Sequence, residues 1–388
     1  MDENLPPNPN PSSVPPLVNP PPLYSSPPII TPPPVSRPRR NGNFWKILAL
    51  LLLVGLGLSI FYNFRRVTHF FSTRQSKNIH HKKQSLEEIL LEDNNAASKI
   101  AVLELNGIIS SKAFDRSDEN IVEAIEQQLK AAEEDKSVKA VVLKINSPGG
   151  EVLASDEINH LIADFQTRAK KPVVASMQTL AASGGYYVSV PCQWIVANDM
   201  TITGSIGVIM HGYNYRGLLT KIGVRPDTYK SGKLKDMLSG EKLPEEILPE
   251  EKEIVQELIM ETYGKFTNVV ATGRADSHQK NSKFKEKGRA LRSDWNEFVD
   301  GRVFSGRQAY EMGFVDELGN FDTAIERAQT LAGIHNANLI EYQRPFDFGN
   351  LFRLFGKTET PALKVDLGVD FPKLQMGCLY FIYRGVLP

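Results

Sequence analysis

One long apolar segment limits what the N-terminal part of this chain can fold into. Ile47–Tyr62 is an uncharged apolar run, and its aromatic flanks extend it to a span over residues 44–64. Twenty-one helical residues reach roughly 31 Å, enough to cross the hydrocarbon core of a bilayer. The run follows more than forty residues and precedes no small-residue cleavage site, which disfavours a cleaved secretory signal. We therefore expect a transmembrane signal anchor at 44–64.

The two flanks of this span differ in composition. Residues 1–40 hold 15 of the 25 prolines, and proline fixes φ and lacks a backbone donor, so residues 1–43 are expected to form a disordered arm. Residues 65–98 are polar and are expected to be a linker. Basic residues lie on both sides of the span, so the positive-inside rule does not decide its orientation.

Charge and cysteine content exclude several functions. Lysine plus arginine and aspartate plus glutamate both number 45, so no basic field favours nucleic acid. The two cysteines, Cys192 and Cys378, fit neither a disulfide framework nor a metal cluster. No metal or other cofactor is expected.

From residue 99 the pattern becomes α/β, with one domain expected over 99–343. Strands are predicted at Ile100–Leu105, Val138–Ile145, Val173–Met177, Trp194–Ala197, Ile206–Met210, Val224–Tyr229 and Asn338–Tyr342. Helices are predicted at Asn120–Glu134, Ser155–Ala169, Pro249–Thr272, Arg307–Met312 and Asp322–Ala332. The basic stretch His278–Ser293 is expected to be a surface insertion. Residues 344–388 form an extension whose apolar run, Leu374–Tyr383, is too short to span a bilayer and suits docking on a neighbour or a groove.

Ser183 is the candidate nucleophile. It lies in Ala181-Ala182-Ser183-Gly184-Gly185, where small neighbours favour a crowded turn with an accessible hydroxyl. If Gly184 opens a helix, its free N–H points at an oxygen that gains charge. The alternative is an ordinary helix N-cap serine, which is commoner in proteins.

Backbone donors for such an oxygen come from an earlier motif. Asn146-Ser147-Pro148-Gly149-Gly150 ends a predicted buried strand, and glycine lets an unshielded N–H approach a carbonyl oxygen. An ordinary tight turn is the alternative.

Lys235 is the candidate base, and Ser205 of Thr203-Gly204-Ser205-Ile206-Gly207 could orient it. A lysine amine near its reference pKa of ~10.4 is protonated at neutral pH, so a basic lysine must be stripped of water. Spacing alone leaves Lys230 and Lys233 as competitors.

A histidine base is an open alternative. His211 follows the predicted strand Ile206–Met210, in the serine–histidine order of the Clp protease subunit. A triad would need one of three carboxylates: Asp199, Asp227 or Asp236.

Together these motifs, in this order, resemble the signal peptide peptidase A family in its short bacterial form. The similarity runs from about Ile100 to about Ala332 and includes the segment from Asp300 to Gly306. The resemblance implies that Ser183 is the nucleophile and that Lys235, at the end of Gly232-Lys233-Leu234-Lys235, is the base. It further implies that Ser205 holds the lysine, that Gly150 donates to the oxyanion, and that Gly184 is a second donor.

The resemblance also carries expectations about fold, partners and location. It implies a Clp/crotonase-type α/β fold of repeated ββα units, and a homo-oligomer in which adjacent protomers supply serine and lysine. The substrates would be cleaved signal peptides in or at the lipid of the bacterial inner membrane, with the N-terminus cytoplasmic and the catalytic domain outside the cytoplasm. The proline arm, the basic stretch and the C-terminal extension depart from the family pattern.

We therefore expect a membrane-anchored serine endopeptidase with a Ser183–Lys235 dyad and no cofactor. The alternatives are a Clp-like Ser-His-Asp peptidase, a crotonase-type acyl-CoA enzyme, and an inactive membrane scaffold.

Overall fold

A computed structural model describes two units of the chain. It describes residues 86–112, 120–344, 378–383 and Gly385, with eight helical residues near the N-terminus: Lys46, Leu50–Val54, Leu56 and Ser59. The chain divides into Met1–His80 and His81–Pro388. Among the described residues, no helix combines the length and apolar character that crossing a membrane requires. The predicted proline-rich arm and most of the predicted anchor lie outside the described residues.

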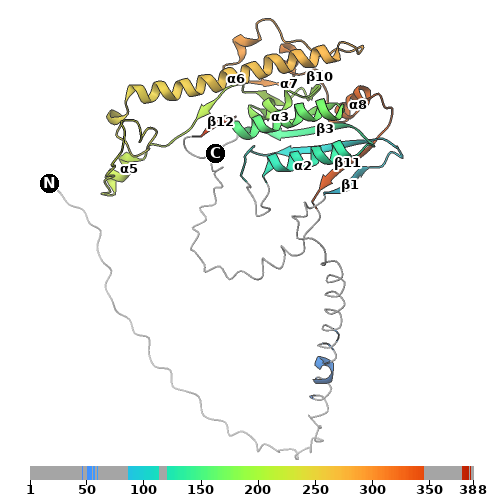
Figure 1. Ribbon diagram of the computed structural model, residues 1–388, viewed down its shortest axis with the longest axis horizontal. Coiled ribbons are helices and arrows are strands. Elements are labelled where there is room, and N and C mark those ends of the chain that lie inside the picture. The colour runs from blue at the N-terminus through green and yellow to red at the C-terminus, as the bar shows by residue number, and fades with distance from the viewer. Residues whose placement is uncertain are drawn as a thin grey trace, which may run out of the picture. The chain divides into compact units, whose positions relative to one another are not determined.

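A mostly parallel sheet forms the centre of the second unit (Figure 1). Its strands run in the order β1-β11-β2-β3-β5-β6-β10, and β7, which pairs with β5, carries β9. The bounds are β1 Glu87–Glu92, β2 Lys99–Asn106, β3 Val138–Ser147, β5 Val173–Ala182, β6 Trp194–Ala197, β7 Ile202–Gly204, β9 Val303–Ser305, β10 Glu317–Leu318 and β11 Asn338–Gln343. Most predicted strands are confirmed within a few residues.

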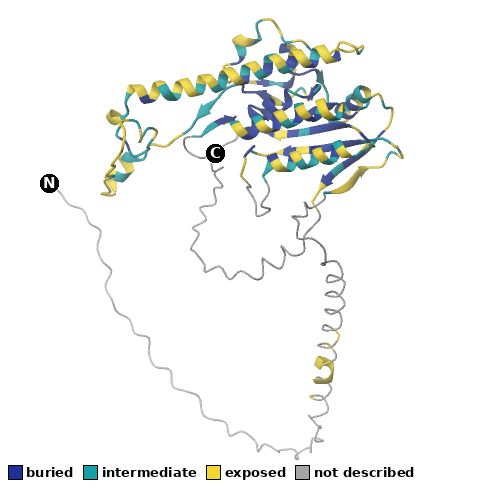
Figure 2. Cartoon of the chain, in the orientation of Figure 1, coloured by how far each residue is buried: buried dark blue, intermediate teal, exposed yellow. Residues whose placement is uncertain are grey.

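Helices cover both faces of this sheet. Alternate residues of a strand point to opposite faces, so Val142 packs in one core and Val141 and Leu143 pack in the other. α8 (Phe321–Ala332) covers the first face through Ala324 and Ala328. The second face is covered by α2 (Ile121–Glu134), α3 (Val152–Ala169), α4 (Gly184–Ser189), α6 (Pro249–Asn281) and α7 (Gly306–Met312). Most residues of the central strands are buried, whereas the edge strand β1 is exposed (Figure 2).

Residues 211–248 leave this layered body at the N-terminal end of α6. They are named here the arm, and they are a different segment from the proline-rich arm at residues 1–43. The arm contains α5 (Arg216–Lys221) and the short 3₁₀ helix η1 (Pro244–Glu246), and most of its residues are exposed (Figures 1 and 2). The predicted strand Val224–Tyr229 is wrong, because this stretch lies in the arm, where no strand of the described residues pairs with it. In the predicted strand Ile206–Met210, only Ile209–Met210 pairs, as β8.

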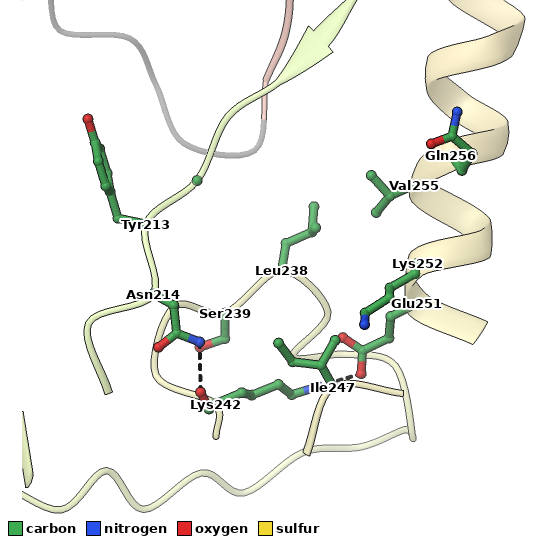
Figure 3. A pocket seen from close by; sticks show the side chains of 12 residues that line it. Tyr213, Asn214, Leu238, Ser239, Lys242, Ile247, Glu251, Lys252, Val255 and Gln256 are labelled. Carbon is green, nitrogen blue, oxygen red and sulfur yellow. Dashed lines mark hydrogen bonds and ion pairs between the residues drawn. The ribbon is translucent and has the colours of Figure 1, made fainter. Parts of the chain in front are cut away.

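Buried charges fix the base of the arm. Lys242 Nζ donates to Glu251 Oε1 at 2.6 Å and lies 3.0 Å from Asp236 Oδ1, and these contacts outweigh burial in raising the pKa of Lys242. The Lys242 carbonyl accepts from Asn214 Nδ2 at 2.9 Å. Figure 3 shows the contacts of Lys242 with Glu251 and Asn214 beside a cavity of about 320 Å³ between the arm and the first turns of α6.

A second sheet has three strands and contains part of the C-terminal extension. Its order is β4 (Gly149–Glu151), β12 (Leu379–Ile382) and β8 (Ile209–Met210), with β12 antiparallel to both neighbours. The extension therefore contributes a strand within a groove of its own chain, as the apolar run suggested. The segment expected to be a linker likewise contributes β1, which pairs with β11.

A buried ion pair joins α6 to the turn after α7. Arg274 is fully buried and pairs with Asp316, and Arg274 Nε donates to the Gly313 carbonyl at 3.2 Å. The Asp316 carboxylate also accepts from the backbone N–H groups of Ile195 and Arg289. Arg289 lies in the basic stretch expected to be a surface insertion; the stretch is mostly exposed, but this hydrogen bond and the buried Asn281 anchor it to the body.

Replacing Arg274 by methionine is expected to lower the free energy of unfolding by about 3–5 kcal/mol, because it leaves the Asp316 charge buried without its partner. Thermal and urea unfolding of the full chain in detergent, followed by circular dichroism, measure the loss. Arg302→Met is the matched control, because Arg302 pairs with Asp300 at an exposed site. Equal losses for the two variants would contradict the structural role of the buried pair.

Candidate active site

The backbone at Ser183 has an unusual conformation between β5 and α4. Ser183 has φ 54° and ψ −115°, a region that non-glycine residues adopt only when surrounding contacts impose it. Its N–H donates to the Gly204 carbonyl at 2.8 Å, and its carbonyl accepts from Tyr187 N–H at 2.8 Å. The side chain makes no capping hydrogen bond to α4, although Ser183 occupies the N-cap position. The geometry therefore does not support the N-cap alternative, and it resembles the strained turn that presents a catalytic hydroxyl.

The paired glycines lie directly against this turn. A Cβ on Gly149 would lie 2.5 Å from Gly184 N, and a Cβ on Gly150 would lie 1.9 Å from the Ile109 carbonyl oxygen. Only glycine permits this approach of β4 to the start of α4. The structure thus places Gly184, the residue after Ser183, against Gly149, which directly precedes the predicted site residue Gly150.

Ser205 lies in the loop after β7, the strand that pairs with the end of β5. Ser205 is buried, has φ 51°, and its N–H donates to the Arg302 carbonyl at 2.7 Å. It lines a cavity of about 460 Å³ with apolar neighbours that include Val208, Ile209 and Met260. A side chain that entered this cavity would contact these apolar groups.

Lys235 lies elsewhere, in an exposed turn of the arm. Within residues 120–344, no hydrogen bond or ion pair joins Lys235 to Ser183 or Ser205. The two competing lysines do have partners: Lys230 pairs with Asp236 at 2.9 Å and Lys233 pairs with Glu250 at 2.5 Å. No carboxylate pairs with Lys235 in the described part of the chain, so its amine is available to a group outside this protomer.

The structure does not bring together the groups that the histidine alternative requires. His211 Nε2 is buried without a hydrogen-bond partner among the described residues, and the ring packs edge-on against Tyr213. The three candidate carboxylates are engaged elsewhere: Asp199 by Arg307, Asp227 by Tyr229 and Asp236 by Lys230. The structure therefore does not bring a Ser183–His211–Asp triad together.

The carboxylate nearest the glycine pair is also occupied. Glu151 accepts hydrogen bonds from Ser110 Oγ and from the N–H and hydroxyl of Ser111 at 2.7–2.9 Å. Burial opposes ionisation, but these donors lower the pKa of Glu151. A carboxylate held in this way is poorly suited to the general-base role that a crotonase-type reaction requires.

Tyr187 is a buried residue beside Ser183 that the sequence did not single out. It lies one turn after Ser183, and its hydroxyl donates to Asp156 Oδ1 at 2.7 Å. Asp156 also pairs with Lys265 of α6, so α3, α4 and α6 meet at one carboxylate. Burial and the Asp156 charge raise the pKa of Tyr187 above the usual tyrosine range. The motif contained two tyrosines, but the long-range contact that distinguishes Tyr187 was not visible in the sequence.

Comparison with known proteins identifies the family. The profile of peptidase family S49 matches residues 166–335, and the Clp protease profile matches residues 92–191. A protein assigned as a signal peptide peptidase SppA in Enterococcus faecium is 39% identical over 272 residues, which cover 68% of this chain and 73% of the relative. A protein assigned as a protease in Synechocystis is 42% identical over 236 residues, which cover 61% of this chain and 75% of the relative.

These matches confirm the Clp/crotonase-like α/β fold and the serine protease activity predicted from the motifs. They also remove the acyl-CoA alternative, since the relatives are assigned as proteases. The chain belongs to peptidase family S49 and is a serine protease of that family.

Proposed function

We propose that this protein is a membrane-anchored endopeptidase that degrades cleaved signal peptides with a Ser183–Lys235 dyad. The observation that carries the proposal is the strained turn at Ser183, which lies against the Gly149–Gly150 strand without a capping hydrogen bond. The name of the Enterococcus relative supports signal peptides as the substrate class.

The proposed chemistry uses the site groups in sequence. Ser183 Oγ attacks the peptide carbonyl carbon as the Lys235 amine takes the hydroxyl proton. The Gly150 and Gly184 N–H groups stabilise the oxyanion. Lys235 then protonates the leaving amine, and water activated by the same lysine hydrolyses the acyl-enzyme to release the acid product.

We propose that Lys235 acts on the Ser183 of a second copy. Six large hydrophobic side chains of the arm are exposed to water in the single chain: Tyr213, Leu218, Ile222, Val224, Tyr229 and Leu238. Burying them against another copy would bury apolar surface and remove water from Lys235 in the same step. The cavity beside Ser205 offers the amine a place next to apolar side chains.

The apolar run at 44–64 supports the anchor, because its length and its aromatic ends suit a single span. The extracytoplasmic position of the catalytic domain rests on the family resemblance. A bacterial inner-membrane location follows from this anchor and from the substrate class.

The test compares two labelled peptides of equal length, one with the apolar core of a signal peptide and one polar, using the full chain in detergent. We expect cleavage of the apolar peptide only. His211→Ala is expected to keep near wild-type activity, because His211 contacts no candidate carboxylate. Loss of activity in His211→Ala with folding intact would support the Clp-like triad, and equal cleavage of both peptides would contradict the substrate class.

A further inference from the structure

Lys235, the proposed base, lies in a turn over residues 230–239, named here the lysine turn. The Lys235 side chain is exposed. Two backbone hydrogen bonds shape the turn: Lys235 N–H donates to the Gly232 carbonyl at 3.2 Å, and Ser239 N–H donates to the Asp236 carbonyl at 3.1 Å. These contacts are local, and they do not fix the turn relative to the body of the protein. The direction in which Lys235 points therefore depends on what anchors the lysine turn.

Asp236, the residue after the proposed base, carries the anchoring contacts. Its carboxylate contacts two ammonium groups, Lys230 Nζ at 2.9 Å and Lys242 Nζ at 3.0 Å. The Lys230 side chain is 37% exposed, whereas that of Lys242 is 8% exposed. An exposed ion pair contributes little because water screens it, whereas breaking a buried pair is costly. The contact with Lys242 therefore fixes Asp236 more firmly than the contact with Lys230.

Lys242 connects Asp236 to α6. Its Nζ also donates to Glu251 Oε1 at 2.6 Å, and the Glu251 side chain, in the first turn of α6, is 4% exposed (Figure 3). Farther along, α6 is joined to the body, where the Tyr263 hydroxyl donates to the Val299 carbonyl at 2.7 Å. Lys242 therefore gives the lysine turn a buried connection to the body.

The charge of Lys242 suits an anchor and not a base. Burial alone would lower the pKa of Lys242, but the contacts with Glu251 and Asp236 outweigh burial and raise it. The amine therefore stays protonated at neutral pH and cannot take the proton of Ser183. The main chain of Lys242 is held as well, since its carbonyl accepts from Asn214 Nδ2 at 2.9 Å.

We propose that Lys242 is a positioning residue for the proposed base, Lys235. By joining Asp236 to Glu251, Lys242 sets the direction in which the arm presents the base to another copy. The inference rests on the proposed function, because it takes Lys235 as the base. A base must lie within hydrogen-bond reach of the nucleophile, so a small displacement of the lysine turn slows the reaction. It leaves peptide binding intact, because Ser183 and the glycine motifs lie on the body and not on the arm.

The experiment compares Lys242→Met, which removes the charge, with Lys230→Met, the same change at the exposed partner of Asp236. Hydrolysis of the apolar signal-peptide substrate by the full chain in detergent gives kcat and KM. We expect Lys242→Met to lower kcat by about 10- to 100-fold, with KM changed by less than about 3-fold. Lys230→Met should keep most of the wild-type kcat. Lys242→Arg should keep it too, because the cavity of about 320 Å³ beside Lys242 has room for the longer side chain.

A double variant separates positioning from stability. Lys242→Met alone leaves the Glu251 carboxylate buried without its ammonium partner, so it should lose stability as well as activity. Lys242→Met combined with Glu251→Leu replaces the buried pair by apolar side chains, and it should recover most of the stability in urea unfolding. Its kcat should stay as low as that of Lys242→Met, because Asp236 is still not connected to α6. Recovery of kcat together with stability would overturn the inference.

Mixing variants shows which half of the shared site Lys242 serves. Lys242→Met chains keep Ser183, so adding Ser183→Ala chains, whose lysine turn is intact, should raise hydrolysis several-fold. Adding Lys235→Ala chains should give no rise, since neither chain then has a correctly held base. A rise that is the same with both partners would overturn the inference.

Lys235→Ala alone distinguishes failure of the inference from failure of the proposed function. An inactive Lys235→Ala chain beside a Lys242→Met chain with wild-type kcat would overturn the inference and leave the proposed function standing. If Lys235→Ala kept wild-type hydrolysis, the proposed base would be wrong and the inference would fail with it.

Discussion

Replacing Ser183 by alanine is expected to reduce peptide hydrolysis by more than about 1,000-fold, because the proposed reaction has no other nucleophile for the acyl-enzyme. The variant should fold normally, since the Ser183 hydroxyl makes no capping hydrogen bond and its backbone contacts with Gly204 and Tyr187 remain. Steady-state hydrolysis of the apolar signal-peptide substrate measures the loss, and circular dichroism checks the fold.

Ser189 provides the matched control for this prediction. It lies on the same short helix, is buried, and donates its hydroxyl to the Gly185 carbonyl at 2.8 Å. Ser189→Ala should lose about 1 kcal/mol of stability and keep its activity. If Ser183→Ala retained activity similar to that of Ser189→Ala, the attacking group would be one other than Ser183. If instead Ser183→Ala lost peptide cleavage but kept its full biological effect, the result would favour the scaffold alternative.

Replacing Lys235 by alanine is expected to reduce hydrolysis by about 100-fold or more, the usual contribution of a general base. The fold should be unaffected, because the side chain is exposed and has no ion-pair partner in the described part of its own chain. Lys230→Ala and Lys233→Ala are the controls. Both remove an arm lysine that is paired with a carboxylate, so both should leave most of the activity. A larger loss in either control than in Lys235→Ala would identify a different base.

Local patterns in the sequence predicted the parts of the fold that depend on near neighbours. The strand Trp194–Ala197 is confirmed at both ends, because a short buried run between a turn and a polar loop leaves little choice of register. The helix from Asn120 is confirmed with Asn120 as its N-cap. The motifs at Gly149–Gly150 and Ser183 are likewise adjacent in space, since each follows a neighbouring parallel strand of the sheet.

The features missed from the sequence depend on distant partners. All six residues of β1 are exposed, so the strand lacks the apolar alternation that would have indicated it. β12 pairs with strands more than 160 residues away in the chain, and its apolar run alone does not specify a groove. The contacts of Asp156 with the Tyr187 hydroxyl and with Lys265 are invisible for the same reason, since each residue in isolation is typical of a helix surface.

The position of Lys235 relative to Ser183 likewise could not be predicted from local sequence patterns. The motif order predicts a serine and a lysine that act together, whereas the single chain holds Ser183 in the body and Lys235 on the exposed arm. A dyad shared between copies accounts for both positions, because Ser183 of one copy then meets Lys235 of another copy only in the assembly.

The measurement that tests this account most directly mixes the two inactive variants. Ser183→Ala chains retain the lysine and Lys235→Ala chains retain the serine, so an assembly containing both places some intact pairs at the contact between copies. Solubilised together and allowed to exchange, the mixture should recover a substantial part of wild-type hydrolysis, while each variant alone stays inactive. A mixture that forms mixed assemblies by crosslinking and yet shows no activity would contradict a dyad formed between protomers.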